Sequence, residues 1–379
     1  MNRRTLRLIP LAVAGTLALA ACGGNASGQE SAAEQGRLQV VTSTTVYADL
    51  VSRIGGDLVE ASPVINSVSQ DPHSYEATSR DKLALSKAQL VVANGGGYDA
   101  FMDVLAKDLK LSESTVINAV DTSPIAAGEK AEDTGKHDEH ADEAAAHDEH
   151  ADEAAAHDEH ADEAAAHDEH ADEAAAHDEH ADEAAAHDDH AAEEATADEH
   201  EGHGHASYNE HVWYDLESMR LLTDEIAKRL AVLKPEGAAT FTANAASLTS
   251  DLKNLEAKVE KLHGSLDGKH FAMTEPVPFH LLEDLGMSDA TPEGLSESIE
   301  GGGEVSPQAF NEMGKRFDAG DIDMLAYNTQ TESPQTERIR KQADAAKVPV
   351  IDFTETLPPN TDYVSWMDSN IQAVEALAK

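Results

Sequence analysis

The chain has 379 residues, a net charge of −46 at neutral pH and a single cysteine. A surface this acidic repels the phosphate backbone of DNA and RNA, so nucleic-acid binding is excluded, and a lone cysteine excludes an internal disulfide. A chain of this length is too long for one small core, which predicts two domains.

The N-terminal segment has the pattern of an export signal. Arg3, Arg4 and Arg7 precede an apolar run from Leu8 to Ala21. This run is shorter than the ~20 residues that span a bilayer, and it suits the core of a secretion signal. The Leu-Ala-Ala-Cys sequence that ends at Cys22 resembles the bacterial lipobox, in which the cysteine carries a lipid.

We therefore expect residues 1–22 to be a lipoprotein signal peptide and residues 23–36 to be a flexible tether. The lipid on Cys22 would hold the exported chain at the outer face of the cytoplasmic membrane or in the periplasm. An ordinary secretion signal with a chance cysteine is the alternative. It is less favoured, because no second cysteine exists to pair with Cys22.

Strand-like and helical patterns alternate in the next part of the chain. The predicted strands are Leu38–Thr42, Leu58–Val64, Leu90–Ala93 and Thr115–Asn118. The predicted helices between them are Val46–Ile54, Arg80–Ala88 and Tyr98–Leu109. This alternation is typical of a mostly parallel sheet covered by helices.

A low-complexity insertion follows, over residues 129–206. From His137 the unit HDEHADEAAA occurs five times without change, and a degenerate copy begins at His187. An intact unit has no large apolar side chain, so it cannot bury enough surface to offset the entropy of ordering the chain. We expect this insertion to be disordered.

The insertion is also rich in metal ligands, because it carries 15 of the 20 histidines. Neutral imidazole suits zinc, copper, iron and nickel, so we interpret the insertion as a low-affinity collector of metal ions. A spacer that grew by replication slippage is the alternative. The accessory ligands that we expect here include His137, His140, His147, His150, His200, His203 and His205.

After the insertion, Leu216–Leu233 has an amphipathic helical pattern, and a long charged helical pattern runs from Pro235 to about Leu262. The second pattern is too long and too polar for a simple crossover, so we expect it to link two lobes. The later predicted strands are His270–Thr274, Ile322–Tyr327 and Val348–Phe353. The later predicted helices are Val277–Leu285, Ser306–Phe317, Ser333–Ala346 and Tyr363 to the C-terminus.

The predicted fold class is therefore α/β, with two lobes that each contain a mostly parallel sheet flanked by helices. We assign residues 37–233 to the N-terminal lobe, including the insertion. Residues 234–264 form the linking helix, and residues 265–379 form the C-terminal lobe.

Four candidate metal ligands lie near predicted strand ends, where open α/β sheets bind their ligands. His73 lies in a loop behind Pro72, and His211 follows the insertion. Glu275 and Glu355 each end a predicted strand. Two nitrogens and two carboxylates, two from each lobe, could close a four-coordinate metal site. A single loop histidine is more often an ordinary surface residue, so the prediction depends on all four positions together.

Four motifs resemble those of the zinc and manganese solute-binding proteins of ABC transporters. They are DPHSYE at 71–76, HVWYD at 211–215, TEPV at 274–277 and FTETLP at 353–358, and residues 40–57 are also similar to the opening strand and helix of that family. The resemblance covers roughly residues 38–379 without the insertion. It implies two lobes joined by one long helix, a metal ion between them, a monomer, and delivery of the ion to a membrane permease.

The resemblance also implies a ligand set. His73 and His211 match the two histidines of the N-terminal lobe. The third position is histidine in many zinc-binding members and glutamate in many manganese-binding members, and Glu275 occupies it here. The fourth position is aspartate in many members, and Glu355 occupies it here. His280 and Asp352 are the alternative ligands at these two positions.

The metal expected from these ligands is Zn²⁺, because imidazole binds manganese weakly by comparison and the insertion is rich in histidine. Mn²⁺ is the alternative, because a glutamate stands at the third position.

An enzyme is not expected: the chain has no HExxH sequence and no serine nucleophile elbow, and its Gly-Gly-Gly runs lack the P-loop lysine. A passive zinc buffer or metallochaperone and an adhesin with the same fold are the further alternatives.

Deleting residues 137–205 separates a metal site between the lobes from a passive buffer. We expect the deleted chain to keep tight binding of one ion and to lose weaker binding of further ions, because the four candidate ligands lie outside the deletion. Chelator competition and metal-to-protein stoichiometry measure the two classes of site. Loss of the tight site in the deleted chain would support the buffer interpretation.

Overall fold

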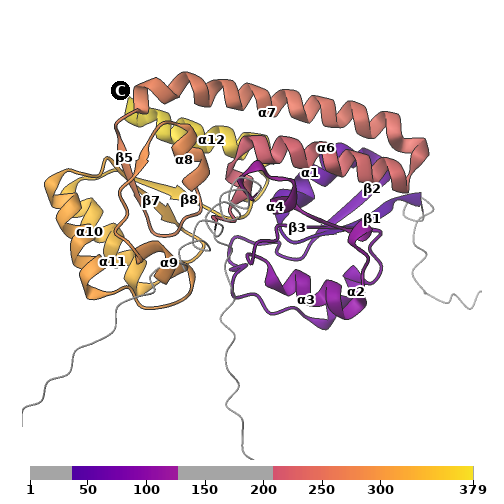
Figure 1. Ribbon diagram of the computed structural model, residues 1–379, viewed down its shortest axis with the longest axis horizontal. Helices are drawn as coiled ribbons and strands as arrows, with labels where there is room; N and C mark the ends of the chain where they lie inside the picture. Colours follow the sequence, from indigo (N-terminus) through magenta and orange to yellow (C-terminus); the bar gives the residue numbers. More distant parts are fainter. Residues whose placement is uncertain (1–35, 127–207, 379) are drawn as a thin grey trace, which may run out of the picture.

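The computed structural model describes residues 36–126 and 208–378. Within these ranges the chain forms two lobes, each with a four-stranded parallel sheet and surrounding helices, joined by one long helix (Figure 1). The predicted fold class is thus confirmed. The predicted signal peptide with Cys22, and the histidine-rich insertion with its accessory ligands, lie outside the described residues.

The N-terminal lobe contains a parallel sheet with the strand order β2-β1-β3-β4. Its central strand β3 is buried along its whole length, as expected of an apolar strand covered on both faces. The strands are β1 (Leu38–Thr42), β2 (Val59–Pro63), β3 (Leu90–Ala93) and β4 (Val116–Asn118). The helices are α1 (Thr45–Gly55), α2 (Ser79–Leu85), α3 (Ala100–Leu109) and α4 (Ala119–Thr122).

The C-terminal lobe has the equivalent strand order β6-β5-β7-β8, also parallel. Ser306 and Ser333 cap two of its helices, each with proline at the first turn, as the sequence predicted. The strands are β5 (His270–Met273), β6 (Ser288–Asp289), β7 (Met324–Asn328) and β8 (Val350–Phe353). The helices are α8 (Phe279–Asp284), α9 (Leu295–Glu300), α10 (Pro307–Ala319), α11 (Pro334–Ala346) and α12 (Tyr363–Glu375).

The long helix α7 (Ala238–Leu266) follows α6 (Leu216–Leu233) and a short 3₁₀ turn at Pro235–Gly237. With 29 residues, α7 extends over ~43 Å at 1.5 Å per residue, and it lies along both lobes (Figure 1). Its buried side chains recur at intervals of three, four or seven residues, which gives one apolar stripe on an otherwise polar helix. They are Phe241, Ala245, Leu248, Leu252, Leu255, Val259 and Leu266.

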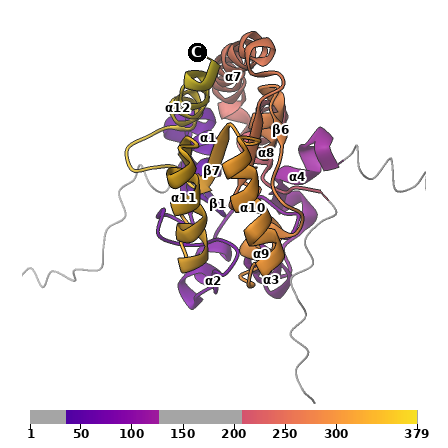
Figure 2. The same cartoon turned by 90° about the vertical axis from the view of Figure 1, so that its left-hand side faces the viewer.

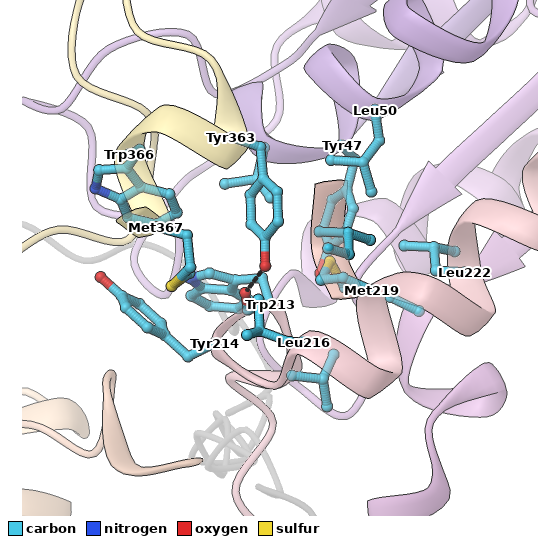
Figure 3. Close-up of a cluster of buried hydrophobic side chains, with 14 of the residues drawn as sticks. Tyr47, Leu50, Trp213, Tyr214, Leu216, Met219, Leu222, Tyr363, Trp366 and Met367 are labelled. Carbon is cyan, nitrogen blue, oxygen red and sulfur yellow. Dashed lines mark hydrogen bonds between the residues drawn. The ribbon is translucent and has the colours of Figure 1, made fainter. Parts of the chain in front are cut away.

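The last helix, α12, packs beside α7 and also contacts α1 of the other lobe (Figures 1 and 2). Figure 3 shows Tyr363 and Trp366 of α12 against Trp213 and Tyr214, which belong to a 3₁₀ turn at Val212–Tyr214. The hydroxyl of Tyr363 donates to the carbonyl oxygen of Trp213 at 2.7 Å. The Tyr214 and Trp366 rings lie 5.3 Å apart.

One hydrophobic cluster therefore runs through both lobes. It contains Leu50 and Trp213 from the N-terminal lobe together with Phe271, Met324 and Phe353 from the C-terminal lobe. A shared core of this kind opposes large movements of one lobe against the other. Among the helices that the structure describes, none combines the length and the apolar character needed to cross a bilayer.

We expect Leu252→Ala in α7 to lower the free energy of unfolding by ~2–5 kcal/mol, because this fully buried side chain belongs to the shared core. Asn254→Ala, on the exposed face of the same helix, is the matched control and should change it by less than ~0.5 kcal/mol. Urea unfolding followed by tryptophan fluorescence measures both. Equal effects of the two substitutions would contradict a core role for α7.

Candidate metal centre

The connection after β2 carries His73 to the junction of the lobes. Asp71 folds this connection as an Asx turn, because its Oδ1 accepts the backbone N–H of His73 at 2.9 Å and its Oδ2 accepts the Ser74 hydroxyl at 2.7 Å. The His73 ring packs edge-on against Tyr98, with 4.9 Å between ring centroids. Nε2 of His73 then lies 3.8 Å from Oε2 of Glu355 in the other lobe.

His211 is fully buried and is oriented by Asn209. Oδ1 of Asn209 accepts the backbone N–H of His211 at 3.0 Å and lies 2.7 Å from Nδ1 of the same histidine. An amide oxygen only accepts hydrogen bonds, so Nδ1 carries a ring proton, and in the neutral ring Nε2 is the nitrogen that can bind a metal. A partner that fixes the ring tautomer in this way is typical of histidine ligands of metals.

Glu355 follows β8 and is fully buried. Its Oε1 accepts Nδ2 of Asn328 at 2.8 Å, and its Oε2 accepts the hydroxyl of Tyr98 at 3.0 Å. Asn328 belongs to the C-terminal lobe and Tyr98 to the N-terminal lobe. The two donors hold the carboxylate so that Oε2 faces the histidines.

Two overlapping groups of possible metal ligands result, each with its ligand atoms within 4.8 Å of one another. One group is His73, His211 and Glu355, and the other is His73, Glu210 and Glu300. We call these five residues the interlobe cluster. The structure thus brings together three of the four ligands expected from the sequence, and it adds two glutamates that sequence reasoning missed.

Glu300 approaches both histidines from the end of α9. Its Oε1 lies 3.5 Å from Nε2 of His211 and 3.9 Å from Nε2 of His73. The sequence offered one usable signal, since Leu295 and Ile299 are four residues apart and Glu300 precedes a glycine run that can end a helix. Helix α9 has only six residues, which is too short for a helical period to be recognised in the sequence.

Glu275 lies beside the interlobe cluster and belongs to neither group. It is buried, and its Oε2 accepts hydrogen bonds from Nδ2 of Asn328 and from the hydroxyl of Thr331, the latter at 2.6 Å. Asn328 therefore donates to both Glu275 and Glu355. Glu275 also lines a pocket of about 340 Å³ together with Asp71 and Glu300.

The two alternative ligands have other partners and belong to neither group. Nε2 of His280 lies 3.0 Å from the carbonyl oxygen of Asn209, to which it can only donate, and burial lowers the pKa of His280. Asp352 is half exposed and pairs with Arg340 at 2.8 Å. The structure therefore gives His280 a packing role and Asp352 a surface ion pair.

The carboxyl groups of the interlobe cluster disfavour one another's ionised forms. Burial, followed by the charges of Glu210, Glu275 and Glu355, raises the pKa of Glu300 to about 9. Burial, followed by Glu275, raises the pKa of Glu355 as well. Burial also raises the pKa of Glu275, although hydrogen bonds from Thr331 and Asn328 oppose this shift. A bound cation would favour the ionised forms and release the protons.

Comparisons with known proteins agree with this architecture. The family described as zinc-uptake complex component A, periplasmic (ZnuA), matches residues 40–377. The manganese ABC transporter substrate-binding lipoprotein PsaA of Streptococcus pneumoniae is 30% identical over 143 residues, which is 36% of this chain and 45% of that protein. For the metal ABC transporter substrate-binding lipoprotein FimA of Streptococcus parasanguinis the identity is 31% over 146 residues, with the same two shares. The matched segment thus spans less than half the length of these relatives.

Solved structures share the fold. The periplasmic zinc binding protein TroA from Treponema pallidum superposes with a TM-score of 0.61 at 18% identity, over 90% of this chain and 99% of that chain. Zn(II)-bound AdcA from Streptococcus pneumoniae gives 0.58 at 15% identity, over 90% and 58% of the two chains. At these identities the likeness establishes the two-lobe fold alone.

We expect metal affinity to rise with pH up to about 9, because a metal ion must displace the protons of the clustered carboxyl groups. The metal-free protein should show the opposite trend in stability: folding raises the pKa of Glu300 from 4.5 to about 9, so stability falls progressively as the pH rises between these two values. Chelator competition and thermal unfolding at several pH values measure the two trends. An affinity that does not vary with pH would contradict proton displacement.

Proposed function

This chain belongs to the ZnuA family of zinc-uptake components, and we propose that it captures a transition-metal ion between its lobes and delivers it to the membrane permease of an ABC transporter for import. The observation that carries the proposal is the convergence of Nε2 of His73, Nε2 of His211 and Oε2 of Glu355. These side chains come from both lobes, so an ion bound by all three would bridge them. Glu275, which the resemblance implies for the third position, accepts a hydrogen bond from Nδ2 of Asn328, which also donates to Glu355.

The donor set supports Zn²⁺ as the cargo. Zinc takes four ligands from imidazole nitrogens and carboxylate oxygens, and two imidazoles in one site favour it over manganese. Each oxygen of Glu355 accepts one hydrogen bond, which favours monodentate coordination through Oε2 over bidentate coordination. Several carboxylates nevertheless surround the site, so Mn²⁺ is the alternative cargo. Elemental analysis of the purified protein, followed by zinc and manganese competition, decides between them.

Gln330 connects the two sides of the proposed site. Its Nε2 donates to the carbonyl oxygen of Gln70, next to the His73 turn, at 2.7 Å. Its Oε1 accepts the backbone N–H groups of Glu355 and Thr356, both at 3.2 Å. Release to a permease would require this bridge to open. Because the lobes share one core, we propose a small separation of the lobes rather than a wide hinge motion.

The proposed place of action is outside the cytoplasmic membrane, with a lipid anchor at Cys22. The expected signal sequence supports this location, and so do the words lipoprotein and periplasmic in the names of the similar proteins. The family is one of solute-binding proteins rather than enzymes. Labelling with a radioactive fatty acid, lost in Cys22→Ala, tests the anchor.

Substituting either histidine of the proposed site should abolish tight binding. We expect His73→Ala and His211→Ala each to weaken zinc affinity by more than about 100-fold, because even the outer partners of metal ligands contribute ~10–100-fold. His270→Ala is the matched control, since His270 is an exposed histidine of β5. Chelator competition at fixed pH gives the affinities. Equal affinities in the three variants would refute the site.

A further inference from the structure

We propose that His280 and the carbonyl oxygen of Pro276 hold Asn209 from the C-terminal lobe, and that Asn209 in turn keeps the His211 ring of the N-terminal lobe in the orientation and tautomer that bind a metal ion. Asn209 and His280 are then positioning residues, since neither belongs to the interlobe cluster. The inference rests on the proposed function and deepens it, because it makes the state of one ligand depend on the contact between the lobes.

Asn209 forms hydrogen bonds to both lobes. Within its own lobe, its Oδ1 accepts the backbone N–H of His211 at 3.0 Å and lies 2.7 Å from Nδ1 of the same residue. Toward the other lobe, its Nδ2 donates to the carbonyl oxygen of Pro276 at 2.7 Å, and its backbone carbonyl oxygen lies 3.0 Å from Nε2 of His280. We call the two contacts with Pro276 and His280 the Asn209 clamp.

These contacts decide which way the Asn209 amide faces. A backbone N–H only donates and a carbonyl oxygen only accepts, so the amide oxygen must face His211 and the amide nitrogen must face Pro276. The amide oxygen then requires a proton on Nδ1 of His211, which leaves Nε2 of the neutral ring as the nitrogen that can bind a metal.

Helix α8 holds His280 in place for this contact. Its neighbours Leu281 and Leu282 are fully buried in the core that the lobes share, and α8 contacts the Val212–Tyr214 turn that follows His211. Burial lowers the pKa of His280, although the hydrogen bond to Asn209 opposes the shift. The ring is therefore neutral at pH 7, and its one N–H is the Nε2–H that the Asn209 carbonyl oxygen accepts.

The Asn209 clamp is sensitive to the spacing of the lobes. Hydrogen bonds of this kind have lengths of ~2.7–3.2 Å, so a separation of ~1 Å at α8 would break both contacts. Only the backbone N–H of His211 would then oppose rotation of the Asn209 amide. Once the amide rotates, the ring proton of His211 is no longer confined to Nδ1, and fewer rings present Nε2 in the form that binds a metal.

The test substitutes His280 in the full chain and compares it with a matched histidine. His280→Leu removes the donor at similar volume, and His280→Gln keeps an N–H donor. The control is His263→Gln. Nδ1 of His263 also lies 3.0 Å from a backbone carbonyl oxygen, that of Asp284, but His263 is exposed and lies outside the Asn209 clamp.

Two measurements report the result. Chelator competition gives the Zn²⁺ affinity. Long-range ¹H–¹⁵N correlation spectra of the metal-free chain, labelled with ¹⁵N-histidine, show which ring nitrogen of His211 carries the proton, at a pH at which this ring is neutral. The His211 signals are those that disappear in His211→Gln. A substitution that only loosens packing would not shift the ring proton.

We expect the wild-type chain to hold the His211 proton on Nδ1 and His280→Leu to spread it over both nitrogens. The Zn²⁺ affinity of His280→Leu should fall by about 10-fold, at the lower end of the ~10–100-fold effects of residues that orient metal ligands. His280→Gln should restore the tautomer and most of the affinity, and His263→Gln should match the wild-type chain in both. Asn209→Ala should shift the proton in the same way and weaken affinity further, by up to about 100-fold.

The proposal is wrong if His280→Leu keeps the wild-type tautomer and affinity, or if His263→Gln has the same effects as His280→Leu. His280→Met, which also lacks a donor but has a flexible side chain, replaces His280→Leu if that variant does not fold. Failure of the wild-type chain to bind Zn²⁺ tightly would refute the proposed function instead. The two failures are distinguishable, because the tautomer of His211 is measured without metal.

Discussion

Buried negative charge is the constraint on which the junction of the lobes depends. The interlobe cluster contains three glutamates and two histidines, and the buried carboxylate of Glu275 lies beside it. Uncompensated carboxylates in a dry environment cost several kcal/mol each, so this arrangement is stable only with protons or a cation on the acids. The proposed cargo would therefore also supply the counter-charge for these acids.

The rest of the fold positions these acids and limits their movement. Parallel sheets direct the carboxyl ends of their strands to one edge, and each lobe turns that edge toward the other. Helix α7 lies along both lobes, and α12 packs beside it and contacts α1 of the N-terminal lobe (Figure 1). The aromatic residues Trp213, Tyr214 and Trp366 pack against one another where the lobes meet (Figure 3). The proposed site is consequently formed by a nearly rigid frame, and we expect its affinity to depend on small changes in lobe spacing.

Much of this could be predicted from the sequence. The helix expected at Leu216–Leu233 has those bounds in the structure, and the strands were located to within a few residues, because long apolar periodicities are strong local signals. Two of the expected ligands, His73 and His211, are oriented by residues two positions before them. Asp71 forms an Asx turn with the backbone N–H of His73, and Asn209 contacts the imidazole ring of His211.

The features that could not be predicted depend on very short elements or on contacts between segments far apart in the sequence. Strand β6 has two residues and helix α9 has six, too few for any period to emerge. The location of Glu300 beside two histidines depends on how the lobes meet, about which its neighbours in sequence carry no information. The same holds for Glu275, whose hydrogen bonds come from Asn328 and Thr331, more than 50 residues away.

Both imidazole nitrogens of the interlobe cluster, those of His73 and His211, come from the N-terminal lobe, and the C-terminal lobe offers carboxylate oxygens only. In the proposed site neither half would be a strong chelator alone, and tight binding would arise because the frame keeps the ligands of one lobe at a high effective concentration around an ion held by the other. Such an advantage falls steeply with distance. A partner that moves the lobes slightly apart would leave the ion bound by the ligands of one lobe only. The ion would then dissociate, although the chemistry of its ligands is unchanged.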